Sequence, residues 1–155
     1  MYTDFNSEES PTMCGRRISY LYRKSGTYFT MELKKLGLSP TQSIILIGIY
    51  RHEGVNQCTL GEIISVLPSV ASRVLRELED KGYITRERDE QNRRNYNLYL
   101  TPRGRELAEQ SLLVQGRYWD TLLEEFTPEE ADTLNHLLAR MERRAYRVEP
   151  SSELH

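Results

Sequence analysis

The order of structural signals between residues 60 and 104 constrains the fold of this chain more than any other feature. A short helical pattern leads through a turn into a second one, which Pro68 opens and Gly82 closes. Two strand-like runs, 83–88 and 95–100, then flank a polar tip. This order predicts a helix-turn-helix with a two-stranded wing.

The second helix of this motif has two chemically different faces. Apolar residues at helical spacing line one face, and they are Val70, Ala71, Val74, Leu75 and Leu78. The other face carries Ser69, Ser72, Arg73, Arg76 and Asp80. Acidic side chains crowd its C-terminal half, so the N-terminal half is the part suited to DNA. Hydroxyl and guanidinium groups there match the base edges of a major groove.

Arginines are concentrated in the predicted wing, where they are Arg86, Arg88, Arg93 and Arg94. The formal net charge of the chain is only -2, so groups that bind DNA have to be concentrated rather than numerous. The two arginines of the tip suit the negative potential of a narrow minor groove. The alternative is that they keep the tip soluble. The two arginines of the strand either decorate it or contact the DNA backbone.

Two arginines of the second helix also have alternative partners one turn further on. Arg73 either contacts bases and phosphates or pairs with Glu77. The serines and the second arginine on the same face favour the DNA role. Arg76 is equally compatible with DNA and with a pair to Asp80.

Outside the winged motif the chain predicts long helices. We expect helices over 12–36, from Ser39 to about Gly54, over 101–126 and over 127–148. The terminal helices have more apolar surface than a small domain can cover, which predicts packing against a second copy. The fold class is therefore mainly α with a small β-wing. Its predicted regions are flexible tails at 1–11 and 149–155, a helical dimerisation region at 12–53 and 102–148, and a winged helix-turn-helix at 54–101.

Composition places the chain among soluble, single-domain proteins. It has 155 residues, of which 38% are hydrophobic and 28% charged. Its two cysteines are too few for a disulfide framework. The acidic, polar N-terminus lacks the pattern of a signal peptide, and no apolar segment is long enough to span a membrane. These features predict a cytoplasmic protein.

The winged segment resembles the MarR family of transcriptional regulators. The resemblance rests on the run 73–84, which reads RVLRELEDKGYI, and on a wing signature. In the family this signature is Asp-x-Arg, five residues, then Leu-Thr-x-x-Gly. Here it appears as Asn92, Arg94, Leu100, Thr101 and Gly104. The order of helices matches the family from about residue 13 to residue 148.

This resemblance implies a homodimer that binds a pseudo-palindromic operator in double-stranded DNA, most often as a repressor. By position, Ser69, Val70, Ser72 and Arg73 would meet base edges and phosphates, and Arg94 would enter the minor groove. Many members also bind small aromatic or phenolic ligands and then release DNA. The residues that suggest such an effector pocket here are Arg16, Arg17, Tyr20 and Tyr50. The alternative for these tyrosines is the dimer core.

Other kinds of site are poorly supported by the sequence. His52, His136 and Cys58 lack the spacing of metal ligands, so neither a metal nor a cofactor other than the effector is expected. Cys14 is expected to be an inert, half-buried cysteine rather than a peroxide-sensing thiol. No catalytic motif is present, which argues against an enzyme. The alternative function is a winged helix that binds proteins instead of DNA.

Overall fold

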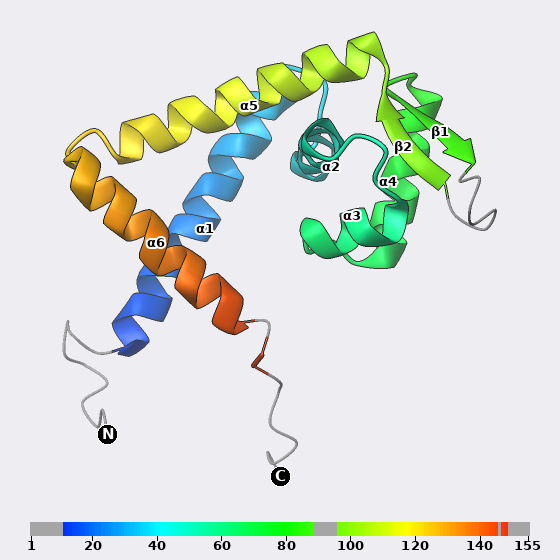
Figure 1. Cartoon of the computed structure of the whole chain (residues 1–155). Helices are drawn as coiled ribbons and strands as arrows, with labels where there is room; N and C mark the ends of the chain where they lie inside the picture. Colours follow the sequence, from blue (N-terminus) through cyan, green and yellow to red (C-terminus); the bar gives the residue numbers. More distant parts are fainter. Residues whose placement is uncertain (1–10, 89–95, 146, 149–155) are drawn as a thin grey trace. The chain divides into compact units, whose positions relative to one another are not determined.

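The computed structural model describes residues 11–88, 96–145 and 147–148, and these form six helices and one two-stranded sheet (Figure 1). In chain order the elements are α1 (Pro11–Lys34), α2 (Pro40–Arg51), α3 (Gln57–Ile63), α4 (Pro68–Asp80), β1 (Ile84–Arg88), β2 (Tyr96–Leu100), α5 (Pro102–Leu122) and α6 (Pro128–Ala145). The predicted fold class is confirmed. The chain divides into two compact units, residues 1–117 and 118–155, which are described separately here.

Local capping signals place most helix ends where the sequence predicts them. Ser39 caps α2 in a reciprocal capping box with Gln42, and Asn56 caps α3 by accepting from the N–H of Thr59. Gly37 and Gly82 follow α1 and α4 with positive φ angles of 72° and 68°. The least accurate end is that of α5, which stops four residues before the predicted position 126.

Helices α3 and α4 form the helix-turn-helix. Their axes differ by 115°, within the range of this motif. Ser65 in the turn between them has a positive φ of 53°. Leu67 precedes α4 without offering a side-chain cap, and Pro68 fills the first helical position, where no N–H has to be satisfied.

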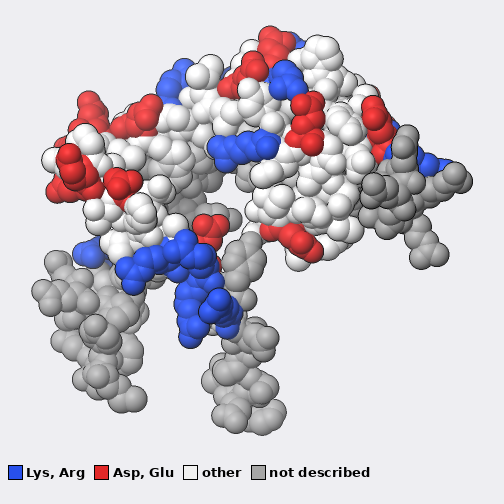
Figure 2. All heavy atoms as spheres, viewed as in Figure 1, with Lys and Arg blue, Asp and Glu red and all other residues white. Residues whose placement is uncertain are grey.

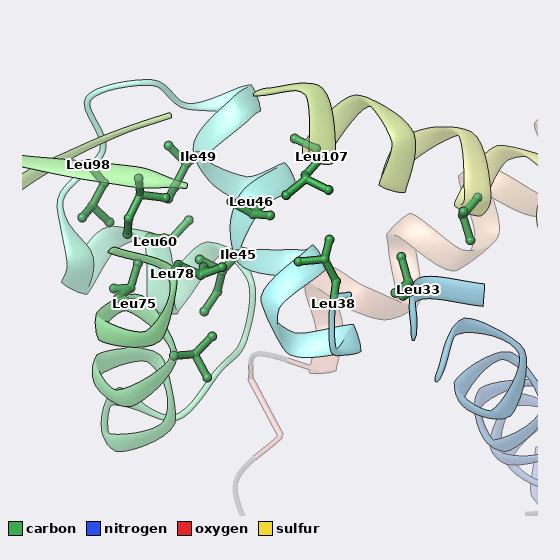
Figure 3. Packing of buried hydrophobic residues seen from close by; sticks show 14 residues of the cluster. Leu33, Leu38, Ile45, Leu46, Ile49, Leu60, Leu75, Leu78, Leu98 and Leu107 are labelled. Atoms are coloured by element: carbon green, nitrogen blue, oxygen red, sulfur yellow. The ribbon is translucent and has the colours of Figure 1, made fainter. Parts of the chain in front are cut away.

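The hydrophobic core of residues 1–117 surrounds α2 (Figure 3). Ile45, Leu46 and Ile49 of α2 are fully buried, as the continuous apolar run of this helix predicts. Side chains from α3, α4, β2 and α5 converge on them, and these are Leu60, Leu75, Leu78, Leu98 and Leu107. Each such leucine stabilises the fold by about 1.5–3 kcal/mol through burial. The core therefore fixes α4 through its apolar face.

The wing is attached to the end of α2. In the antiparallel pair, Ile84 lies opposite Leu100 and Arg88 opposite Tyr96. On its other edge Leu98 accepts from the N–H of Gly54 at 2.9 Å and donates to the carbonyl of Val55 at 3.0 Å. The predicted inward alternation of β2 holds for Leu98 but is wrong for Tyr96, which is 41% exposed because it lies at the outer end of the strand.

The start of α5 is joined tightly to the segment between α4 and β1. The N–H of Thr101 donates to the carbonyl of Tyr83 at 3.0 Å, and its hydroxyl donates to the carbonyl of Gly82 at 2.8 Å. The same hydroxyl accepts from the N–H of Gly104 at 3.1 Å. A Cβ atom at Gly104 would overlap the carbonyl of Tyr83, so only glycine fits there. These contacts give the Leu-Thr-x-x-Gly part of the wing signature a structural cause.

The second unit consists of the end of α5 and of α6. Thr127 and Glu130 form the predicted capping box of α6. No residue of α6 is buried, although Leu134, Leu137, Leu138 and Met141 recur at helical spacing. Figure 2 shows acidic side chains around the turn into α6 and basic ones over its C-terminal half. Its middle is therefore an exposed apolar face between two charged ends.

None of the helices in the described ranges is by itself long and apolar enough to cross a membrane.

Candidate nucleic-acid interface

The exposed face of α4 carries the polar residues that the sequence assigned to DNA. Ala71, Val74, Leu75 and Leu78 are buried on the opposite face. Ser69, Arg73 and Arg76 are exposed, and Ser72 is half-buried. These four side chains, together with Glu77 and Asp80, line a hollow of about 400 Å³. The structure thus brings the predicted serines and arginines together on one surface of a helix held by the core.

Val70 is placed differently from the other predicted contacts of α4. It is half-buried and packs against the hydrophobic core. Its position beside Ser69 leaves only part of the side chain facing outward. This packing favours a structural role for Val70, and its contact with DNA stays a prediction.

The two arginines of α4 differ in their partners. The Arg73 guanidinium lies 2.8 Å from Glu77, the partner that the sequence offered as its alternative. Its side chain is still 67% exposed, so the guanidinium is accessible. Within the described residues Arg76 has no acidic partner within 4.0 Å, and the alternative pair with Asp80 is not formed. Both arginines can therefore reach a ligand on this face.

Glu77 has a second partner, which the sequence did not suggest. Gln42 of α2 donates from Nε2 to Glu77 Oε2 at 3.1 Å. Gln42 is only 6% exposed, and its Oε1 accepts from the N–H of Ser39 in the capping box of α2. The residues in this contact are 35 positions apart, so helical spacing could not reveal it.

The two arginines of β1 also lie in different surroundings. Arg86 is half-buried, and its Nε lies 2.8 Å from Glu79 Oε2 in an ion pair that lacks the alignment of a hydrogen bond. This contact joins β1 to α4 and favours a structural role for Arg86. Arg88 is exposed at the end of the strand. Contacts of either arginine with DNA stay predictions, and Arg93 and Arg94 lie outside the described residues.

The predicted effector residues lie on two different helices. Arg16, Arg17 and Tyr20 are exposed in the first half of α1. Tyr50 of α2 donates its hydroxyl to Glu109 of α5 at 3.3 Å, and the Arg105 guanidinium lies 5.4 Å from the centre of its ring. Tyr50 is therefore engaged with α5, and a pocket that contains all four residues stays a prediction.

Neither cysteine is half-buried as expected. Cys14 and Cys58 are both free and exposed, because they lie on solvent-facing sides of α1 and α3. Among the described residues, His, Cys, Asp and Glu side chains form no group of three that could hold a metal ion.

Comparisons with known proteins agree with this geometry. The family model described as MarR family matches residues 38–96, which include α2, α3, α4 and β1. A relative from Bacillus subtilis (strain 168), described as the uncharacterized HTH-type transcriptional regulator YybA, is 32% identical over 127 residues. This match covers 81% of the present chain and 84% of the relative.

Solved structures of similar proteins extend the match to nearly the whole chain. A MarR transcriptional regulator from Methanosarcina mazei Go1 has a TM-score of 0.78 and 28% identity, over 88% of this chain and 99% of that chain. A MarR family regulator from Listeria monocytogenes, solved with a 26mer DNA, has a TM-score of 0.79 and 26% identity, over 83% and 86% of the two chains. From these matches and from its winged helix-turn-helix, the chain belongs to the MarR family.

Proposed function

We propose that this protein is a homodimeric transcriptional regulator that binds double-stranded DNA sequence-specifically and acts as a repressor. The observation that carries the proposal is the exposed serine and arginine face of α4, whose other face is fixed in the core. A rigid helix with donors on its outer face can enter a major groove and read base edges. The DNA complex of the similar Listeria monocytogenes regulator supports the same use of the fold.

The dimer is supported by apolar side chains that the chain leaves exposed. They lie on α1, on the end of α5 and on α6, and include Leu21, Met31, Trp119, Leu137 and Leu138. A second copy is the simplest cover for such helices. A two-fold dimer would present two recognition helices about 34–36 Å apart, which suits two half-sites of a pseudo-palindrome.

A small aromatic or phenolic effector completes the proposal. Such a ligand would bind beside the dimer helices and lower the affinity for DNA, with Arg16 or Arg17 holding an anionic group. The exposed guanidinium groups of α1 are compatible with this role. No other cofactor is proposed.

Selection of bound sites from random DNA, with and without phenolic ligands, tests the function. We expect the wild-type protein to enrich a pseudo-palindromic site and a gel shift of that site to weaken as salt is raised. A winged helix that binds only proteins would enrich no sequence and give no salt-dependent shift. Recovery of random sequences alone would contradict the proposal.

Replacing Arg73 by alanine tests the recognition face. We expect the affinity for the selected site to fall about tenfold or more and the preference over scrambled DNA to relax, since one good base contact is worth about 1–3 kcal/mol. The measurement is a titration of both DNAs by fluorescence anisotropy. The matched control is Arg103→Ala, which removes an exposed helix arginine with a carboxylate partner 2.7 Å away. Equal losses of preference in the two variants would contradict the role of Arg73.

Replacing Arg94 by alanine tests the wing. We expect binding to weaken similarly on selected and scrambled DNA, because a minor-groove arginine contributes mainly electrostatic attraction. The slope of log affinity against log salt should become shallower by about 0.9, which corresponds to one phosphate contact. Titrations at several salt concentrations measure this slope. An unchanged slope and affinity would remove Arg94 from the interface.

A further inference from the structure

A chain of three polar contacts connects the N-terminus of α2 to the recognition face of α4. The N–H of Ser39 donates to Gln42 Oε1 at 3.0 Å, and Gln42 Nε2 donates to Glu77 Oε2 at 3.1 Å. Arg73 then donates to Glu77 Oε1 at 2.8 Å. Each oxygen of the Glu77 carboxylate therefore has one partner, and one of these partners belongs to another helix.

This arrangement differs from an ordinary ion pair on a helix surface. A pair of exposed side chains four residues apart is weak, because both side chains move and water screens their charges. Here Gln42 is nearly buried, and its other amide atom is fixed by the capping box of α2. The amide can offer its N–H group in one direction only, which fixes the carboxylate of Glu77 and through it the guanidinium of Arg73.

The pairing leaves Arg73 able to bind DNA. A guanidinium has five N–H donors, and the contact with Glu77 uses one on NH1. The remaining donors can still make a two-pronged contact with a base edge. A guanidinium held against α4 reaches the bases below the helix, whereas a free one also reaches phosphates on either side.

We propose that Glu77, held by Gln42, is a specificity-determining positioning residue that directs Arg73 to base edges. This inference rests on the proposed function, because it concerns how the same α4 face reads DNA. The carboxylate also reduces the local positive charge, so it disfavours contacts that depend on phosphate alone. Glu77 thus lowers affinity for arbitrary DNA while it raises the preference for the selected site.

The reciprocal exchange of the two side chains tests this proposal. Gln42→Glu keeps the size and the capping acceptor but places an oxygen against the Glu77 carboxylate, which breaks the contact. Glu77→Gln keeps an acceptor for Arg73 but turns an amino group toward the amide of Gln42. In the double variant, the amide at position 77 can donate to the carboxylate at position 42 and still accept from Arg73.

The readout is the ratio of affinities for the selected site and for a scrambled site at one salt concentration. We expect each single variant to lower this ratio about fivefold, a fraction of what one base contact contributes, and the double variant to restore it to within about twofold. The single variants change the net charge in opposite directions. A pure charge effect would therefore move their overall affinities in opposite directions and leave both ratios unchanged, which would overturn the proposal.

Two controls separate a failure of this proposal from other failures. Thermal unfolding of each variant shows whether α2 and α4 remain folded, and Glu77→Gln, at a partly exposed position, serves if Gln42→Glu unfolds. A folded double variant that keeps the low ratio would also overturn the proposal. If the wild-type protein itself shows no preference among sequences, the proposed function fails and not only the role of Glu77.

Discussion

Replacing Gly104 by alanine is expected to lower the free energy of unfolding by about 3 kcal/mol, a large part of the 5–15 kcal/mol typical of a domain. The added Cβ would overlap the carbonyl oxygen of Tyr83. That carbonyl accepts from the N–H of Thr101 at 3.0 Å and from its hydroxyl at 3.2 Å, so it cannot move aside without loss of both contacts. Urea unfolding followed by circular dichroism measures the change.

Gly116→Ala is the matched control, because it makes the same substitution in the same helix. A Cβ at Gly116 meets no atom within 4 Å, so the added methyl group only restricts the unfolded chain. We expect this variant to be more stable by about 0.5–1 kcal/mol. Both variants are compared at one protein concentration, since association would shift the apparent stability. Equal changes in the two variants would contradict the close approach at Gly104.

The expected loss has a consequence for the interface. Thr101 and Gly104 fix the start of α5 against the segment between α4 and β1, so they also fix where the wing leaves the recognition helix. Their contacts are with backbone carbonyls rather than with exposed groups. The glycine and threonine of the wing signature therefore act through the fold, whereas Arg94 of the same signature is proposed to act on DNA.

Features that depend on a few neighbouring residues could be predicted from the sequence. The capping box of Ser39 and Gln42 needs only one helical turn, and the positive φ of Gly82 needs only the end of α4. The two faces of α4 also follow from helical spacing alone. Local geometry determines all three, and they are confirmed.

Features that depend on which elements meet could not be predicted in this way. The contact between Gln42 and Glu77 exists because α2 packs on α4, and the pair of Arg86 and Glu79 exists because β1 turns back along α4. The sequence analysis placed Arg86 on a strand beside other charges but gave no distance to α4. Burial of the inner part of Val70 also depends on the neighbouring core and not on its own helix.

Replacing Leu138 by glutamate is expected to dissociate the proposed dimer and to weaken binding to the selected site by about 100-fold or more. Leu138 is 45% exposed and lies in the apolar stripe of α6. A charge in the middle of a buried interface costs far more than an apolar side chain left in water. A monomer also loses the second half-site, whose binding is effectively intramolecular in a dimer. Sedimentation equilibrium gives the mass of the species, and anisotropy titrations give the affinity.

Asn135→Glu is the matched control, because it adds the same charge to an exposed position of α6 outside the apolar stripe. Charge alone would weaken DNA binding equally in the two variants, whereas loss of an interface affects only Leu138→Glu. Helicity measured by circular dichroism should be unchanged in both, since the helix contributes no buried residue to the chain's own core. If Leu138→Glu remained a dimer, or if the wild-type protein were a monomer at concentrations that saturate DNA, the apolar face of α6 would have some other cover and the two-half-site geometry would fail with it.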